Sequence, residues 1–120
     1  MKRRLSRFWA GAFWLCLMAV SALALLPDPD GDLPSSGWDK GNHLLAFATL
    51  AGLALQAFPR CKRAIVPGLA LYGGLSEILQ ALTPYRQAEW RDFLADALGA
   101  VLGLVLAAGL RRQFPRLASI

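Results

Sequence analysis

Residues 91–112 read RDFLADALGAVLGLVLAAGLRR, and this stretch decides what kind of fold the chain can form. Between its charged ends, residues 93–110 hold a single ionisable side chain, Asp96, among apolar and small residues. An α-helix needs about 20 such residues to cross the ~30 Å hydrocarbon core of a bilayer. A lone strand or an irregular segment would leave backbone groups without hydrogen bonds in lipid. The stretch therefore predicts a transmembrane helix.

Three more stretches of the same kind precede it. Residues 8–26 contain no ionisable side chain other than a cysteine, residues 41–58 contain His43, and residues 64–82 contain Glu77. The chain is 56% hydrophobic and only 18% charged, against about 25% charged in an average soluble domain. We expect one membrane domain over residues 1–120, with spans at approximately 8–26, 41–58, 64–82 and 92–110 and no separate soluble domain.

The charged residues predict an orientation for these spans. The acidic residues lie in or beside the loops after the first and third spans. Ten of the 13 lysines and arginines lie in segments without any acidic residue: Lys2, Arg3, Arg4, Arg7, Arg60, Lys62, Arg63, Arg111, Arg112 and Arg116. Lysine and arginine concentrate on the cytoplasmic side of membrane proteins. The sequence thus predicts an all-α membrane protein, an antiparallel bundle of four transmembrane helices with the N- and C-termini cytoplasmic.

The basic residues allow two other interpretations. The first span has a basic leader and a small-residue stretch, Ser21-Ala22-Leu23-Ala24, as a cleaved signal peptide would. Its apolar run is longer than usual in a signal peptide, and cleavage would leave three spans. The sequence pI of 9.9 does not predict nucleic acid binding, because the basic residues flank the spans, where anionic lipid headgroups explain them.

The polar side chains inside the spans lie at a similar depth. Glu77 is about five residues from the outer end of its span, or ~7 Å at 1.5 Å per residue. Asp96 and His43 each lie a few residues into their own spans. Ionisable groups at membrane depth are costly and usually face a bundle interior or a water-filled cavity. His43, Glu77 and Asp96 are therefore the candidate catalytic residues.

Helical spacing places these side chains on common faces. Residues three or four apart share one face of a helix, and two such sets occur: Gly73, Glu77 and Gln80, and Asp92, Asp96, Gly99 and Gly103. The Gly-x-x-x-Gly pair favours close approach of another helix. We expect the carboxylates to face one another in a narrow outer cleft, with Lys40, Arg86 and Arg91 at its mouth. Two interpretations stay open, a functional pocket and a structural polar clamp.

Three blocks of the sequence match a family pattern. They are DKGNHLLAF at 39–47, GGLSEILQ at 73–80, and Arg86 followed by RDFLADALGA at 91–100. In this order they resemble the VanZ-like family, whose pattern has an Asp-Lys-x-x-His block, a Gly-x-x-x-Glu-x-x-Gln block, and an Arg plus Asp-x-x-x-Asn-x-x-Gly block. The resemblance covers residues 39–100. Its signature positions here are Asp39, Lys40, His43, Gly73, Glu77, Gln80, Arg86, Asp92, Asp96 and Gly99.

One signature position departs from the family pattern. Asp96 stands where asparagine is more frequent. An ionised aspartate accepts the same hydrogen bonds but adds a second acid near Glu77, which favours a shared proton or a bound cation at this level. The sequence has no Cys or His cluster with metal-ligand spacing and no phosphate-binding glycine loop. Motif spacing therefore predicts neither a metal site nor a cofactor.

The resemblance implies a multi-pass protein of the bacterial cytoplasmic (inner) membrane. The family's namesake gives low-level resistance to the glycopeptide teicoplanin, which comes to this chain only by analogy. We expect the outer cleft to bind the head of a lipid or a lipid-linked cell-wall precursor. The expected partners are the bilayer and such a precursor or a glycopeptide, and the oligomeric state is left open. The headgroup-binding residues would be Lys40, Gln80, Arg86 and Arg91.

Two alternative functions remain, besides the role of a passive partner in a larger complex, which nothing in the sequence excludes. The first is a membrane enzyme acting on a lipid-linked headgroup, with His43 and Glu77 as acid and base. No clear nucleophile accompanies that pair. The second is a proton or ion path, which would need polar side chains in the inner halves of the spans. Those halves hold little that is polar except Gln56.

Overall fold

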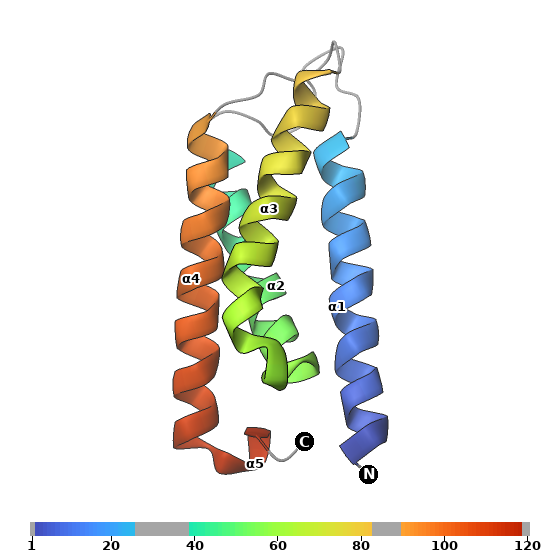
Figure 1. Ribbon diagram of the computed structural model, residues 1–120, viewed down its shortest axis with the longest axis vertical. Helices are drawn as coiled ribbons and strands as arrows, with labels where there is room; N and C mark the ends of the chain where they lie inside the picture. The colour runs from blue at the N-terminus through green and yellow to red at the C-terminus, as the bar shows by residue number, and fades with distance from the viewer. Residues whose placement is uncertain (1, 26–38, 83–89, 119–120) are drawn as a thin grey trace.

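The computed structural model describes residues 2–25, 39–82 and 90–118 of the chain. These residues are almost entirely helical. The elements are α1 (Lys2–Leu25), α2 (Asp39–Ala57), the 3-10 turn η2 (Pro59–Cys61), α3 (Lys62–Ala81), α4 (Trp90–Gln113) and the short α5 (Pro115–Ala118). The molecule measures 47 × 23 × 22 Å, and α1 begins at the same end at which α4 finishes (Figure 1). The predicted all-helical class is confirmed.

Two of the helices are long and apolar enough to cross a membrane. The candidate spans cover Arg4–Ala22 in α1 and Arg91–Gln113 in α4. Helices α2 and α3 meet the same criterion only together, as Gly41–Ala57 with Pro59–Leu79, and the chain turns by 115° at the break between them. The described residues thus contain two candidate spans, or three if the bent pair counts as one. Separate spans at 41–58 and 64–82 stay a prediction.

The junction between α2 and α3 follows from Pro59 and Pro67. Helix α2 finishes at Ala57, before Pro59, and the Cys61 amide donates a hydrogen bond of 3.0 Å to the Phe58 carbonyl across the 3-10 turn. Helix α3 then begins at Lys62, two residues before the predicted residue 64, so Pro67 lies inside the helix and not in its first turn. Because proline has no N–H, one backbone hydrogen bond near the start of α3 is missing.

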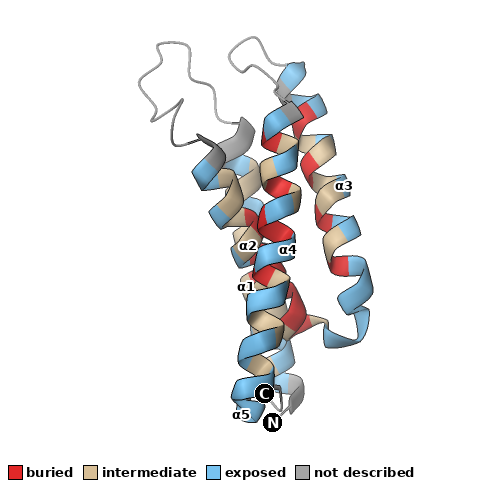
Figure 2. Ribbon diagram, turned by 90° about the vertical axis from the view of Figure 1, so that its left-hand side faces the viewer, coloured by how far each residue is buried: buried red, intermediate tan, exposed pale blue. Residues whose placement is uncertain are grey.

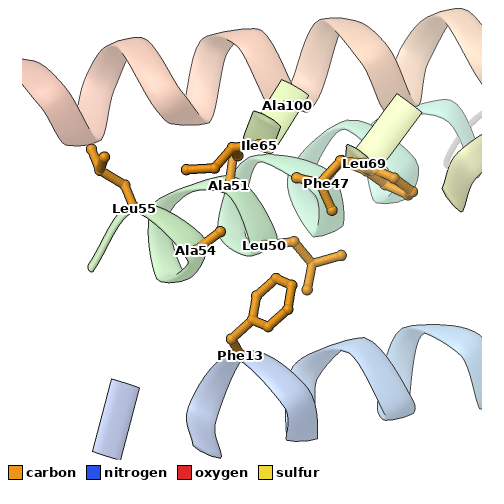
Figure 3. Packing of buried hydrophobic residues seen from close by; sticks show 9 residues of the cluster. All are labelled: Phe13, Phe47, Leu50, Ala51, Ala54, Leu55, Ile65, Leu69 and Ala100. Atoms are coloured by element: carbon orange, nitrogen blue, oxygen red, sulfur yellow. The ribbon is translucent and has the colours of Figure 1, made fainter. Parts of the chain in front are cut away.

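The hydrophobic core centres on α2 and combines large apolar side chains with alanines. The buried hydrophobic residues are Phe13, Phe47, Leu50, Ala51, Ala54, Leu55, Ala57, Ile65, Leu69 and Ala100. Helix α2 supplies most of them and packs most extensively against α4. Figure 2 shows buried positions between α3 and α4 and mostly exposed or half-buried positions on α1. Figure 3 shows Phe13 as the α1 side chain that points toward Leu50 and Ala54.

Helices α2 and α4 approach each other through glycine. A Cβ atom built at Gly99 would lie 3.0 Å from Cα of Leu44, and one at Gly103 would lie 2.6 Å from Cα of Ala48. These distances leave no room for a side chain at either glycine. Lipid tails are as apolar as leucine, so helices in a bilayer associate mainly through close packing of this kind. The Gly99–Gly103 face therefore sets the distance between α2 and α4.

The outer faces of the helices are strongly apolar. Large hydrophobic side chains are more than half exposed on all four long helices, for example Leu15, Leu45, Leu71 and Val105. Water-soluble monomers rarely expose continuous apolar surface on this scale. The surface therefore suits a lipid environment.

A paired substitution tests the close approach of α2 and α4. We expect Gly103→Ala to lower the unfolding free energy by about 1–3 kcal/mol, because the added methyl group forces the two backbones apart. Gly109→Ala is the matched control, since nothing lies within 4 Å of a Cβ there. The measurement is the midpoint of thermal unfolding in detergent. Equal midpoints for the two variants would contradict this packing.

Candidate functional site

Three polar side chains are buried among the residues that the structure describes. They are Glu77 on α3, which is 8% exposed, and Asp92 and Asp96 on α4, at 9% and 1%. All three are carboxylic acids, and burying an ionised carboxylate without compensation is very costly. Such a concentration of acids in an apolar bundle marks this region as the candidate site.

His43, Glu77 and Asp96 meet from three different helices. His43 Nδ1 lies 2.6 Å from Asp96 Oδ1, a hydrogen bond between α2 and α4. Each of the three side chains offers a nitrogen or oxygen atom, and these atoms all lie within 4.8 Å of one another. The start of α2, the end of α3 and the start of α4 share one end of the molecule (Figure 1). We call this group the polar cluster.

Glycines on two helices make room for the polar cluster. Gly99, one turn after Asp96, packs on the backbone of Leu44, the residue next to His43. This contact brings His43 to Asp96. On α3, a Cβ atom built at Gly73 would lie 2.8 Å from Asp96 Oδ2 and 3.1 Å from Asp96 Cβ. The Asp96 side chain thus lies against the bare backbone of Gly73, one helical turn before Glu77.

The two oxygens of Asp96 have different surroundings. Oδ1 takes part in the hydrogen bond with His43. Oδ2 is buried and has no hydrogen-bond partner among the residues that the structure describes. A buried oxygen without a donor costs free energy, so Oδ2 is an acceptor that the described side chains leave available.

The other candidate residues lie around or outside this cluster. Asp92 is buried one helical turn before Asp96 but is not one of the three clustered ligands. Arg91 is exposed at the start of α4. The remaining candidates are outside what is described, either as whole residues or as side chains: Asp39, Lys40, Gln80 and Arg86.

The opposite end of the bundle has polar contacts that the sequence did not indicate. Arg111 Nη1 donates a hydrogen bond to Gln56 Oε1, joining α4 to α2. In the sequence, Gln56 is only an isolated polar residue in an inner half-span. Nearer the middle, the hydroxyls of Ser21 and Tyr72 are hydrogen-bonded and join α1 to α3. Pairs of this kind link distant helices and leave no local sequence signal.

An apolar cavity of about 270 Å³ lies between α1, α2 and α3. Its walls include Phe13, Phe58, Leu69 and Tyr72. None of the cluster residues lines it. The cavity and the polar cluster are thus separate features of the bundle.

Comparison with known proteins gives one match. The protein-family model described as VanZ/LLP1 matches residues 4–111. This range includes α2 and α3, all but the first two residues of α1 and the last two of α4, and every residue of the polar cluster. No curated protein and no solved structure matches the chain.

Substitutions at two neighbouring glycines, Gly73 and Gly74, test the geometry of the polar cluster. His43 is the only histidine in the chain, so ¹⁵N-histidine labelling of protein without a histidine tag gives one imidazole spectrum. We expect Gly73→Ala to shift this spectrum, because its methyl group would displace the Asp96 carboxylate from His43. Asp96→Asn should shift it as well.

Gly74→Ala serves as the control for that experiment. A Cβ atom there would lie 3.6 Å from the Phe93 ring, an ordinary contact. We expect the His43 signals to remain in place in this variant. Identical spectra for Gly73→Ala and the unmodified protein would show that Gly73 does not support the His43–Asp96 contact.

Proposed function

The chain belongs to the VanZ/LLP1 family, and from this premise we propose that it binds the polar head of a lipid, or of a lipid-linked cell-wall precursor, within the bacterial cytoplasmic membrane. The observation that carries the proposal is the polar cluster of His43, Glu77 and Asp96. Polar and ionisable groups inside membrane segments are usually retained for function. The two candidate spans and the family match indicate a membrane protein.

In this proposal α2 and α3 each cross the membrane, which makes four spans. They contain 19 and 20 residues, which corresponds to about 28–30 Å of helix. Arg60, Lys62 and Arg63 lie at their junction, and the positive-inside rule would place that junction and both termini in the cytoplasm. The polar cluster then belongs to the outer leaflet.

The native cysteines allow a test of this orientation. Cys61 is exposed in the turn between α2 and α3, and Cys16 is half-buried in α1. We expect a membrane-impermeant maleimide to label Cys61 only after cells are permeabilised, because the turn is cytoplasmic. The measurement is the mass shift of purified protein.

Two variants complete the orientation test. Cys61→Ser should remove the labelling, which assigns it to this residue. Ser35→Cys, introduced on the Cys61→Ser background, should react in intact cells, since residue 35 belongs to a predicted outer loop. Labelling of Cys61 in intact cells would reverse the proposed topology.

Basic residues near the polar cluster support a phosphate-bearing ligand. Arg91 is exposed at the start of α4, one residue before the buried Asp92. By sequence, Lys40, Gln80 and Arg86 belong to the same end of the bundle. Guanidinium groups bind phosphate with paired, charge-assisted hydrogen bonds. A role in teicoplanin resistance, through altered or masked wall precursors, belongs to the proposal by family analogy alone.

Lipid retention tests the proposed ligand. Native mass spectrometry of detergent-purified protein should detect a specific co-purified lipid or wall precursor. We expect the Arg86→Ala/Arg91→Ala variant to retain at least about tenfold less of it, since each lost charged contact weakens binding by roughly 1.5–3 kcal/mol. The Glu77→Ala/Asp96→Ala variant should lose it too.

The control for lipid retention is Arg60→Ala/Arg63→Ala, which removes the same charge from the opposite end of the helices. It should keep the specific lipid. If the Arg86→Ala/Arg91→Ala variant unfolds at the same temperature as the unmodified protein and retains as much of the lipid, the proposal is wrong.

A membrane enzyme acting on a lipid-linked headgroup is the second candidate. The hydrogen bond between His43 and Asp96 supports it, because a carboxylate on one ring nitrogen orients an imidazole for proton transfer. Glu77 would supply the second acid–base group. The test is whether the protein consumes a labelled lipid-linked substrate. Consumption by the unmodified protein that is lost in the Glu77→Gln variant would establish turnover and not binding alone.

A further inference from the structure

We propose that His43, Glu77 and Asp96 form a binding site for a divalent transition-metal ion. The inference goes beyond the proposed function, since ion binding at these side chains does not require a bound lipid. It rests on two independent features, the geometry of the three ligand atoms and the environment of Asp96 Oδ2.

The geometry suits one ion held by three protein ligands. The ligand atoms of His43, Glu77 and Asp96 all lie within 4.8 Å of one another. With metal–ligand bonds of about 2.1 Å, two ligands of a tetrahedral ion are about 3.4 Å apart. Side-chain rotation would have to widen the 2.6 Å contact between His43 Nδ1 and Asp96 Oδ1 and draw the more distant atoms in to that separation. Because each ligand comes from a different helix, the ion would join α2, α3 and α4.

Asp96 Oδ2 is the second observation. The Asp96 side chain is 1% exposed, and this oxygen has no hydrogen-bond donor among the residues that the structure describes. Close packing on Gly73 holds the carboxylate in place. A purely structural clamp would use both oxygens in hydrogen bonds, since leaving a buried acceptor without a donor is costly. A cation beside Oδ2 gives this oxygen a function.

The ligand types select the class of ion. Imidazole nitrogen with carboxylate oxygen is a common donor set for Zn²⁺, and catalytic Zn²⁺ sites keep three protein ligands and one open position. The same donors suit Mn²⁺ or Fe²⁺. Mg²⁺ and Ca²⁺ prefer all-oxygen ligands and disfavour a histidine. The open position would accept water or an anionic oxygen.

The test measures metal binding alone, on detergent-purified protein carrying a tag without histidine. After removal of metals with a chelator and dialysis, the protein is titrated with Zn²⁺ by calorimetry and with Co²⁺ by visible absorption. We expect one Zn²⁺ ion to bind per chain. Bound Co²⁺ should show the visible ligand-field absorption bands of an ion with a low coordination number. Mg²⁺ should produce no comparable heat.

Ligand variants make the assignment specific. His43→Gln, Glu77→Gln and Asp96→Asn should each weaken Zn²⁺ binding by about 100-fold or more, since even outer-shell changes cost 10–100-fold. These variants keep side-chain size, and thermal unfolding without metal checks their fold. Asp92→Asn is the matched control, because it neutralises a buried carboxylate one turn away on the same helix. We expect it to bind Zn²⁺ like the unmodified protein.

Either of two results would overturn the metal site. One is Zn²⁺ binding by the unmodified protein no stronger than by a His43→Gln/Asp96→Asn double variant. The other is an equal loss of affinity in Asp92→Asn. The lipid proposal fails separately: a protein that binds Zn²⁺ but retains no lipid overturns only the proposed function, and one that retains lipid but binds no Zn²⁺ overturns only the metal site.

Discussion

The close approach of α2 and α4 across Gly99 and Gly103 is the contact on which the rest of the structure depends. A side chain at either glycine would collide with the backbone of Leu44 or Ala48. In a bilayer, helices gain little from hiding apolar surface, so this interlocking of small residues is a principal source of association. It fixes the spacing of the two helices and thereby the distance between the polar groups that they carry.

The same contact explains why an aspartate can be buried deep in an apolar bundle. Asp96 lies one turn before Gly99, and His43 lies beside Leu44, so the glycine contact aligns the two for a hydrogen bond. Gly73 then lets α3 close over the carboxylate and bring Glu77 into the group. The polar cluster is thus a consequence of backbone packing. Among the α1 side chains that the structure describes, only Phe13 is buried, and α1 remains peripheral to the cluster.

The two proposals make different demands on this geometry. Lipid binding depends on basic residues at one end of the helices and on a membrane orientation set by charge. The metal site depends only on three side chains whose atoms are already close. A cation held by two carboxylates would also offset the repulsion between them, which in a site of low dielectric constant is considerable. An ion with an open position and a phosphate-bearing ligand are chemically compatible at one site.

The sequence by itself determined approximately where the helices lie, near which end of its helix each polar side chain is placed, and which faces carry glycine. Apolar runs and helical periodicity suffice for this, because position along a helix and face are properties of one helix at a time. The prediction of a cleft between α3 and α4 used this information. The expectation of no metal site used the absence of any local metal-ligand spacing in the sequence. Only the tertiary structure decided that His43 pairs with Asp96, that Gly73 accommodates this aspartate, and that α2 and α3 meet at a 115° turn. Distances and rotations between helices arise from the packing of side chains far apart in the chain, and a periodic pattern within one helix carries no record of them.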